Sequence, residues 1–183
     1  MEGQSHDDRI QSFSKEPSKA LEKMMDCYGS TILRTAFFYL GDRHLAEDVS
    51  QEVFIRAYRN WEKFRGDSSV KTWLIRITIN LCRDKMSLKA SSEKPTDPFL
   101  IDGSSQFSVE EEVLKRINNT DMLKHVLNLP LHYREVLYLF YYLDLSTAEI
   151  TKAIETPDGT VRGRLHRARK RLEECLKKEG LDQ

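Results

Sequence analysis

The 183-residue sequence carries 29 basic and 29 acidic side chains, and 39% of its residues are hydrophobic. This hydrophobic share is enough to bury the core of one large domain or of two small ones. No stretch approaches the roughly 20 apolar residues that span a bilayer, and the polar residues 1–16 lack the apolar run of a secretion signal, so we expect a cytoplasmic protein.

The three cysteines and five histidines are scattered, with no CxxC pair and no metal-ligand spacing. We therefore expect no disulfide framework and no metal, and we expect each cysteine to be a small buried hydrophobe. The sequence also shows no nucleophile–base pair and no glycine-rich phosphate loop. Neither a cofactor nor catalytic activity is predicted.

The zero net charge hides two segments of opposite sign. Residues 91–121 hold seven acidic against three basic side chains, whereas residues 159–178 hold eight basic against two acidic ones. The first is rich in Ser, Pro and Gly and has the composition of a linker. The second has the charge expected of a nucleic-acid-binding helix.

Hydrophobic residues are dense from Ala20 to Leu88, sparse through residues 87–103 and dense again from Met122 onward. No run alternates apolar and polar residues as a strand does, so we predict an all-α protein with two small helical domains joined by a flexible linker. The expected boundaries are 1–16 for an amino-terminal tail, 17–90 for the first domain, 91–117 for the acidic linker, 118–178 for the second domain and 179–183 for a carboxyl-terminal tail.

The first domain opens with apolar residues at three- and four-residue spacing from Ala20 to Phe37, a pattern that ends at Gly41. Asp42 is expected to cap a second helix, from about His44 to Trp61. Its predicted core stripe consists of Leu45, Ala46, Val49, Val53, Ala57 and Trp61.

The opposite side of this second helix places the aliphatic Ile55 among charged and amide side chains: Asp48, Gln51, Glu52 and Arg59. An apolar anchor with a polar rim is typical of a small protein–protein contact. A solvated face with one stray aliphatic residue is the alternative.

A polar loop, Phe64 to Ser69, then separates this helix from a third one that runs to about Leu88, with Asp67 or Ser68 as the expected cap. The predicted buried residues are Val70, Trp73, Leu74, Ile77 and Leu81. Another sector gathers Thr72, Arg76, Asn80 and Arg83 around Ile79. Arginines and an amide beside a polar loop suit a nucleic-acid strand, and a solvated helix face is the alternative.

The second domain carries the spacing of a helix-turn-helix. Ser146 and Glu149 form a capping-box pattern, and Thr156 and Pro157 are expected to cap and open a second helix. The stripe Val161, Leu165, Ala168, Leu172, Cys175 and Leu176 is predicted to face the core. Basic residues cover the remaining sectors, and Gly163 leaves room for a close approach, so we predict binding in a DNA major groove.

Several ordered motifs resemble the extracytoplasmic-function sigma factors of RNA polymerase. They are Asp48-Val49-Ser50-Gln51-Glu52-Val53-Phe54, Phe64-Arg65-Gly66-Asp67-Ser68, Thr72-Trp73-Leu74, Arg76-Ile77, Leu129-Pro130 to Glu135-Val136, Gly159-Thr160-Val161-Arg162 and Arg167-Ala168-Arg169. The resemblance covers both domains in order. It implies a subunit that binds core RNA polymerase, recognises promoter DNA and promotes its melting, under the control of a separate anti-sigma factor.

The resemblance also implies three sets of site residues. Asp48, Gln51, Glu52, Ile55 and Arg59 would bind the clamp helices of the largest polymerase subunit, while the second domain would meet the flap of the second-largest subunit. Phe64, Arg65, Gly66, Asp67, Ser68, Arg76, Asn80 and Arg83 would bind the −10 element. Thr160, Arg162, Gly163, His166, Arg167, Arg169 and Lys170 would bind the −35 element.

Thr147, Thr151 and His166 depart from the residues that are frequent in this family, so the −35 sequence preference cannot be carried over. The alternative function is a two-domain helix-turn-helix regulator that binds DNA without being a polymerase subunit. Such a regulator would bind a duplex operator tightly by itself, often as a dimer.

Overall fold

The computed structural model describes residues 13–92, 125–126 and 128–178, and every regular element in these ranges is helical, which confirms the all-α prediction. The chain divides into two compact units, Met1–Ile101 and Asp102–Gln183. The expected acidic linker lies outside the described residues, except for its first two residues, which belong to a helix. Both expected tails also lie outside them, except for residues 13–16.

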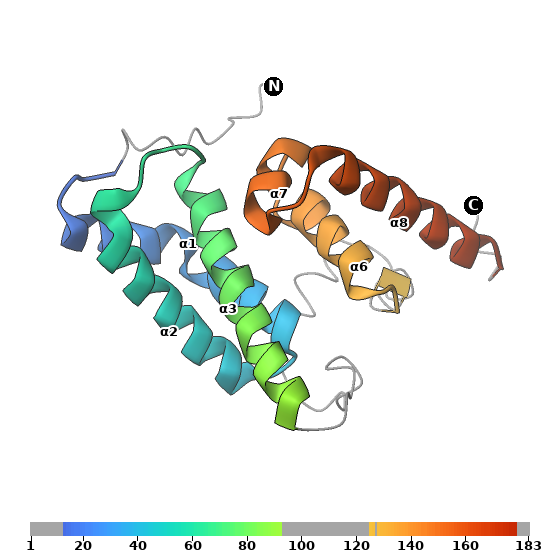
Figure 1. The fold of residues 1–183 in the computed structure, drawn as a ribbon, viewed down its shortest axis with the longest axis horizontal. Coiled ribbons are helices and arrows are strands. Elements are labelled where there is room, and N and C mark those ends of the chain that lie inside the picture. The colour runs from blue at the N-terminus through green and yellow to red at the C-terminus, as the bar shows by residue number, and fades with distance from the viewer. Residues whose placement is uncertain (1–12, 93–124, 127, 179–183) are drawn as a thin grey trace. The chain divides into compact units, whose positions relative to one another are not determined.

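The first unit is built from three long helices, α1 (Pro17–Leu40), α2 (Arg43–Asn60) and α3 (Val70–Ser92), and a short 3₁₀ helix, η2 (Trp61–Lys63). Each long helix packs against the other two, and Figure 1 shows α2 and α3 running side by side across α1. The largest fully buried side chains come from all three helices: Met24, Ile32, Tyr39, Val49, Val53, Val70, Leu74, Ile75 and Ile79.

The turn between α1 and α2 has the predicted chemistry. Gly41 ends α1 with a left-handed φ of 64°, which glycine adopts without steric cost, and its amide donates to the carbonyl of Phe37. The Asp42 carboxylate accepts a hydrogen bond from the amide of Leu45 at 3.0 Å. Asp42 therefore caps α2, as expected from the sequence.

The predicted core stripe of α2 is confirmed for its buried members Ala46, Val49, Val53, Ala57 and Trp61, while Leu45 is half-buried. Phe54, which the stripe omitted, is also buried.

The predicted faces of α3 are partly wrong. Thr72 and Ile79, which we placed on an outward sector, are buried, whereas Trp73 and Ile77, which we placed in the core, are half-buried. The reason is that α3 contacts both α1 and α2, so two adjacent sectors of the helix are covered. A single stripe assumes one covered face.

The cap of α3 is Ser69, not Asp67 or Ser68. The Ser69 hydroxyl accepts from the Thr72 amide at 3.1 Å, and the Ser69 carbonyl accepts from the Trp73 amide. The helix thus begins one residue later than a Ser68 cap would place it and two residues later than an Asp67 cap would.

The cysteines do not share one environment, so the expectation of three buried thiols is wrong. Cys82 is buried, Cys175 is half-buried and Cys27 is exposed on α1. Burial raises the pKa of the Cys82 thiol to about 12. A thiol is nucleophilic only as its thiolate, and a pKa this far above 8 keeps the folded Cys82 thiol almost entirely protonated at pH 8.

Iodoacetamide at pH 8 should therefore alkylate Cys27 rapidly and leave Cys82 unmodified, as measured by mass spectrometry of peptides from the folded chain. In denaturant all three cysteines should react at similar rates. Equal alkylation rates of Cys27 and Cys82 in the folded chain would contradict the packing of α3 against α1.

The second unit contains α6 (Leu131–Leu137), the π-helical segment η4 (Tyr138–Tyr142), α7 (Thr147–Ile154) and α8 (Asp158–Lys178). Both α6 and α7 pack against α8. The predicted stripe of α8 is buried at Val161, Leu165 and Ala168 and half-buried at Leu172, Cys175 and Leu176. The unit's core also includes Val136, Leu139, Ile150, Ala153 and Ile154.

The capping box of α7 is confirmed: the Ser146 hydroxyl accepts from the Glu149 amide, and the Glu149 carboxylate accepts from the Ser146 amide at 2.9 Å. The predicted cap of α8 is wrong. The Thr156 hydroxyl donates to the carbonyl of Ile154, so it closes α7 instead. The Pro157 carbonyl accepts from the amide of Val161 and begins α8.

Glu155 lies in the turn between α7 and α8 with a left-handed φ of 52°, a conformation that costs a residue with a Cβ atom roughly 1–2 kcal/mol. We expect Glu155→Gly to raise the free energy of unfolding by about 1 kcal/mol, because glycine removes the steric cost but adds some entropy to the unfolded chain. Denaturant unfolding measures the change. Lys152→Gly, inside α7, should instead lower stability by about 1 kcal/mol, and a loss of stability in Glu155→Gly would contradict the strain.

Candidate functional site

The outward side of α2 carries the apolar anchor expected from the sequence. Ile55 is 44% exposed, and its predicted neighbours Asp48, Gln51 and Arg59 are exposed as well. Glu52 is half-buried and its carboxylate pairs with Arg56 at 2.8 Å. We call these five predicted residues, Asp48, Gln51, Glu52, Ile55 and Arg59, the Ile55 surface.

Tyr58 extends this surface and was missed by the sequence analysis. It is 47% exposed and follows Ile55 by three residues, which makes the two side chains neighbours on a helix. An exposed tyrosine next to an exposed isoleucine strengthens the apolar part of the surface. The three-residue spacing from Ile55 could have indicated Tyr58, but spacing alone does not distinguish an exposed aromatic residue from the neighbouring core residues.

The loop before α3 rests on aromatic rings. Phe64 stacks on Trp73 with ring centroids 4.6 Å apart and on Trp61 at 5.5 Å. Gly66 takes a φ of 76°, so the loop turns at a position that favours glycine. Phe64 is thus held by packing, while Arg65, Gly66 and Asp67 are exposed and Ser68 is half-buried.

The outward sector of α3 retains the predicted basic residues. Arg76 and Arg83 are exposed and Asn80 is half-buried. They lie on α3, which follows the loop directly, and we group them with the loop as one candidate surface on the first unit. Thr72 and Ile79 do not belong to it, because both are buried.

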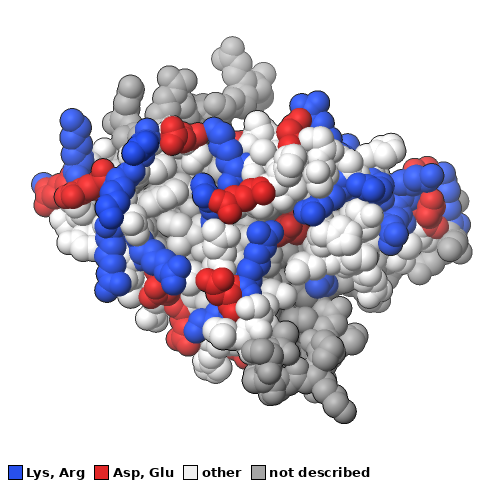
Figure 2. Space-filling model, in the orientation of Figure 1, with Lys and Arg blue, Asp and Glu red and all other residues white. Residues whose placement is uncertain are grey.

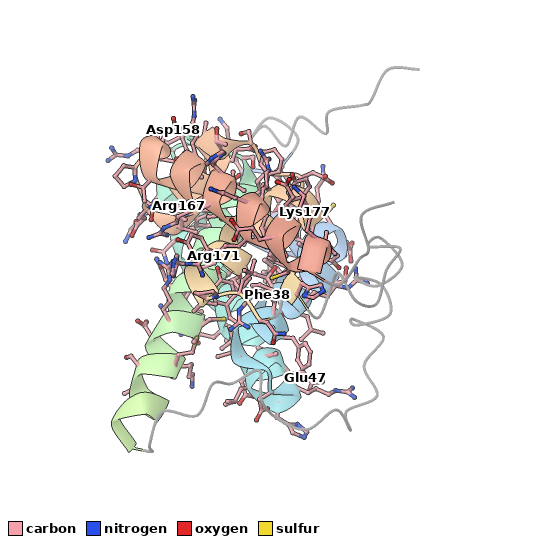
Figure 3. The ribbon with its side chains drawn as sticks, turned by 90° about the vertical axis from the view of Figure 1, so that its right-hand side faces the viewer. Phe38, Glu47, Asp158, Arg167, Arg171 and Lys177 are labelled. Atoms are coloured by element: carbon pink, nitrogen blue, oxygen red, sulfur yellow. The ribbon has the colours of Figure 1, made fainter. Side chains whose placement is uncertain are left out.

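The outward half of α8 collects the predicted −35 residues. Thr160, Arg162, His166, Arg167, Arg169 and Lys170 are exposed, and Gly163 is half-buried. Figure 2 shows Lys and Arg side chains gathered over α8, and Figure 3 shows Arg167 and Arg171 along one side of it. The Arg167 Nε donates to the Gly163 carbonyl at 3.1 Å, and the guanidinium lies over the space that a side chain at Gly163 would enter.

Four arginines on the two flanks of the exposed side of α8 all have partners within the second unit. Arg162 pairs with Asp158 at 2.8 Å, and Arg164 lies 4.0 Å from the buried carboxylate of Glu135. Arg171 lies over the ring of Tyr133 at 5.0 Å. Arg169 Nε donates to the Tyr141 hydroxyl at 2.9 Å, and its guanidinium also lies 5.3 Å from the Phe140 ring.

Three of these contacts attach α8 to its neighbours: Arg164 and Arg171 reach α6, and Arg169 reaches η4. The basic sectors of α8 were predictable from the sequence but these partners were not, because the aromatic and acidic residues on α6 and η4 have no fixed spacing from α8. Partial burial lowers the pKa of His132 on α6, and the nearby positive charges of Arg164 and Arg171 lower it further. His132 is therefore mainly neutral at pH 7.

In the described ranges, no helix is both long and apolar enough to cross a membrane, and no group of three or more His, Cys, Asp or Glu side chains could hold a metal ion.

Comparison with known proteins defines the class of this molecule. A family model of sigma-70 region 2 matches residues 24–91, and a model of sigma-70 region 4 matches residues 122–172. The first match covers most of the three-helix unit and the second covers α6, α7 and most of α8, in the order of a sigma factor of RNA polymerase.

The full-length relatives narrow the class. The chain is 34% identical over 179 residues to the ECF RNA polymerase sigma factor SigW of Bacillus subtilis, covering 92% of this chain and 95% of that protein. It is 32% identical to the RNA polymerase sigma-H factor of Pseudomonas aeruginosa, covering 91% of each chain. The protein belongs to the extracytoplasmic-function sigma factor family.

Solved structures share the fold. The sigma factor RpoE from Bartonella quintana, in complex with the anti-sigma factor NepR, matches with a TM-score of 0.66 and 21% identity over 87% of this chain and 98% of that chain. CnrH, in complex with the cytosolic domain of CnrY, matches with a TM-score of 0.62 and 20% identity over 90% and 98% of the two chains.

Proposed function

We propose that this chain uses three separate surfaces to start transcription at a specific set of promoters. The Ile55 surface binds the clamp helices of the largest subunit of core RNA polymerase. The Phe64–Ser69 loop, with Arg76, Asn80 and Arg83, binds the −10 element. The outward half of α8 reads the −35 element, and the second unit meets the flap of the second-largest subunit.

The observation that carries this proposal is the position of α8 in the helix-turn-helix. A two-residue turn after Glu155 joins the capped α7 to α8, and contacts from Arg164, Arg169 and Arg171 fix α8 against α6 and η4. Rigid elements hold a binding surface in register better than loops do. The exposed Thr160, His166 and Lys170 are thereby presented together, as an approach to base edges and phosphates requires.

Melting is proposed to follow from capture of the unstacked strand by the loop on the first unit. Arg65 and Asp67 are exposed there, while Phe64 is anchored on Trp73. The loop therefore presents polar side chains next to a residue that packing holds in place. Extruding a base from a duplex costs a few kcal/mol, and binding of the extruded base offsets that cost. The loop would therefore stabilise opened DNA without any chemical step.

The chain is proposed to have no catalytic activity, to act in the cytoplasm and to work without a cofactor. Sigma factors are generally not enzymes. Phosphodiester chemistry belongs to the polymerase, and this chain would supply position and DNA opening.

An anti-sigma protein is proposed as the regulator. The two solved relatives of the same fold described above are bound to an anti-sigma factor, NepR, and to the cytosolic domain of CnrY, respectively. A partner that covers the Ile55 surface would prevent binding to polymerase.

The two domains are proposed as residues 17–90 and 118–178, joined by the acidic linker of residues 91–117.

The test is transcription in vitro with purified core polymerase, genomic DNA and the full chain. We expect discrete transcripts that depend on both the polymerase and the chain, and their start sites identify the promoters. If the chain fails to bind core polymerase but binds duplex DNA tightly by itself, the two-domain regulator is the correct function.

A further inference from the structure

Phe13 is the only Phe, Tyr or Trp in residues 1–16, and it is buried against α1 and η2. Only 7% of its surface is exposed. Its ring lies 5.9 Å from Trp61 in an edge-on arrangement and 6.5 Å from Tyr28 in a stacked one. The Lys23 Nζ lies 4.9 Å from the centre of the same ring. The segment before α1 is therefore docked at this point.

The backbone next to Phe13 is fixed by Trp61 as well. The Trp61 Nε1 donates a hydrogen bond to the Ser14 carbonyl at 3.0 Å. A buried indole N–H needs a partner, and here a main-chain carbonyl outside the three helices provides it. Phe13 thus packs against the Trp61 ring, and the Ser14 carbonyl accepts a hydrogen bond from the Trp61 indole N–H.

The rings continue from Phe13 into the loop. Trp61 stacks on Phe64 at 5.5 Å, and Phe64 stacks on Trp73 at 4.6 Å. The order Phe13, Trp61, Phe64, Trp73 therefore joins the segment before α1 to η2, to the first residue of the loop and to α3. We call these four residues the ring series.

We propose that Phe13 is a positioning residue for the Phe64–Ser69 loop, acting through Trp61 on Phe64. This inference rests on the proposed function of that loop in binding the −10 element. Phe13 touches no promoter base itself. It packs edge-on against the Trp61 ring, which in turn stacks on Phe64, so removing the Phe13 ring lets Trp61 shift and loosens the aromatic packing that supports the exposed loop residues. Packed side chains transmit such shifts because protein interiors leave little free volume.

The protein contains two tryptophans, Trp61 and Trp73, and both belong to the ring series. Tryptophan fluorescence therefore reports directly on the packing of the ring series. Phe13→Ala should shift the emission to longer wavelength and increase quenching by acrylamide, while Phe13→Tyr should resemble the parent. Phe38→Ala is the matched control, because Phe38 is near the other end of α1 and packs on Tyr39.

Function is measured with the holoenzyme on a promoter found by the transcription assay, using permanganate reactivity of opened thymines. We expect Phe13→Ala to slow promoter opening by about tenfold, as the loss of two aromatic contacts would do if they support the opened state. Affinity for core polymerase should stay within about twofold, because the Ile55 surface is not part of the ring series. Phe13→Tyr should restore opening.

Two further outcomes separate this inference from the function on which it rests. If Arg65→Ala with Asp67→Ala slows opening but Phe13→Ala does not, the loop binds promoter DNA and Phe13 has no positioning role. If neither change affects opening, the loop proposal fails and the positioning role fails with it. An equal loss of core affinity and opening in Phe13→Ala would mean general destabilisation and would also overturn the inference.

Discussion

Replacing Ile55 by glutamate should abolish binding of the chain to core RNA polymerase. Ile55 is the apolar centre of a surface that already holds Asp48 and Glu52, and it is 44% exposed in the free protein. Truncating a central interface anchor costs about 2–4 kcal/mol, and burying an unpaired carboxylate in its place costs more. The dissociation constant should therefore rise by about a hundredfold or more, as measured by titration of core polymerase with labelled chain.

The fold should survive this change because Ile55 contributes little to the core. Thermal unfolding of Ile55→Glu is expected to match that of the parent. Met25→Glu is the matched control: Met25 is 51% exposed on α1 and lies outside the Ile55 surface, so this variant should retain polymerase binding. Full binding by Ile55→Glu, with the fold intact, would remove the proposed surface from the interface.

Local signals in the sequence predicted the ends of several helices correctly. Gly41, Asp42 and Ser146 act within a few residues of themselves, so the turn and cap chemistry could be recognised without tertiary information. Ser69 and Thr156 show the limit of this approach. Before α3, three neighbouring polar residues could each cap the helix, and the loop conformation selects Ser69. Before α8, the Thr156 hydroxyl bonds back to the carbonyl of Ile154 and is not available as a cap.

Burial was predictable where neighbouring helices cover one face of a helix, and it was not predictable where they cover two faces. The stripe of α8 was correct because α6 and α7 both pack on one side of it. The faces of α3 were misassigned at Thr72 and Ile79, since α1 and α2 cover adjacent sectors of that helix. Periodicity shows how apolar residues are spaced and does not show how many neighbours a helix has.

The candidate surfaces were predictable as patterns, but the contacts that shape them were not. Exposure of Ile55, Arg76 and Arg167 agrees with the sequence patterns, while their roles remain proposals. The contacts of Arg169 with Tyr141 and of Phe13 with Trp61 join residues 28 and 48 positions apart in the sequence. Such pairs follow from tertiary packing alone. Under the proposed function, these contacts hold α8 and the Phe64–Ser69 loop in place.

Arg167→Ala should weaken binding of the holoenzyme to the −35 element by about 1–3 kcal/mol if Arg167 reads a base edge. In the free chain its Nε donates to the Gly163 carbonyl, and the side chain lies on the surface. A surface arginine can leave such a contact at small cost, because water replaces the lost hydrogen bond. The guanidinium is then available for the bidentate hydrogen bonds that arginine makes to guanine.

Binding measured over a range of salt concentrations distinguishes base reading from phosphate contact. Loss of a base contact lowers affinity and relaxes the sequence preference at one position, whereas loss of a phosphate contact reduces the salt slope by about one unit across all sequences. Lys177→Ala is the matched control, because it removes the same charge near the far end of α8, where Lys177 pairs with Glu173. If Arg167→Ala changes neither the affinity nor the salt slope, Arg167 does not belong to the −35 surface, and the first turns of α8 must bind DNA through their other exposed residues.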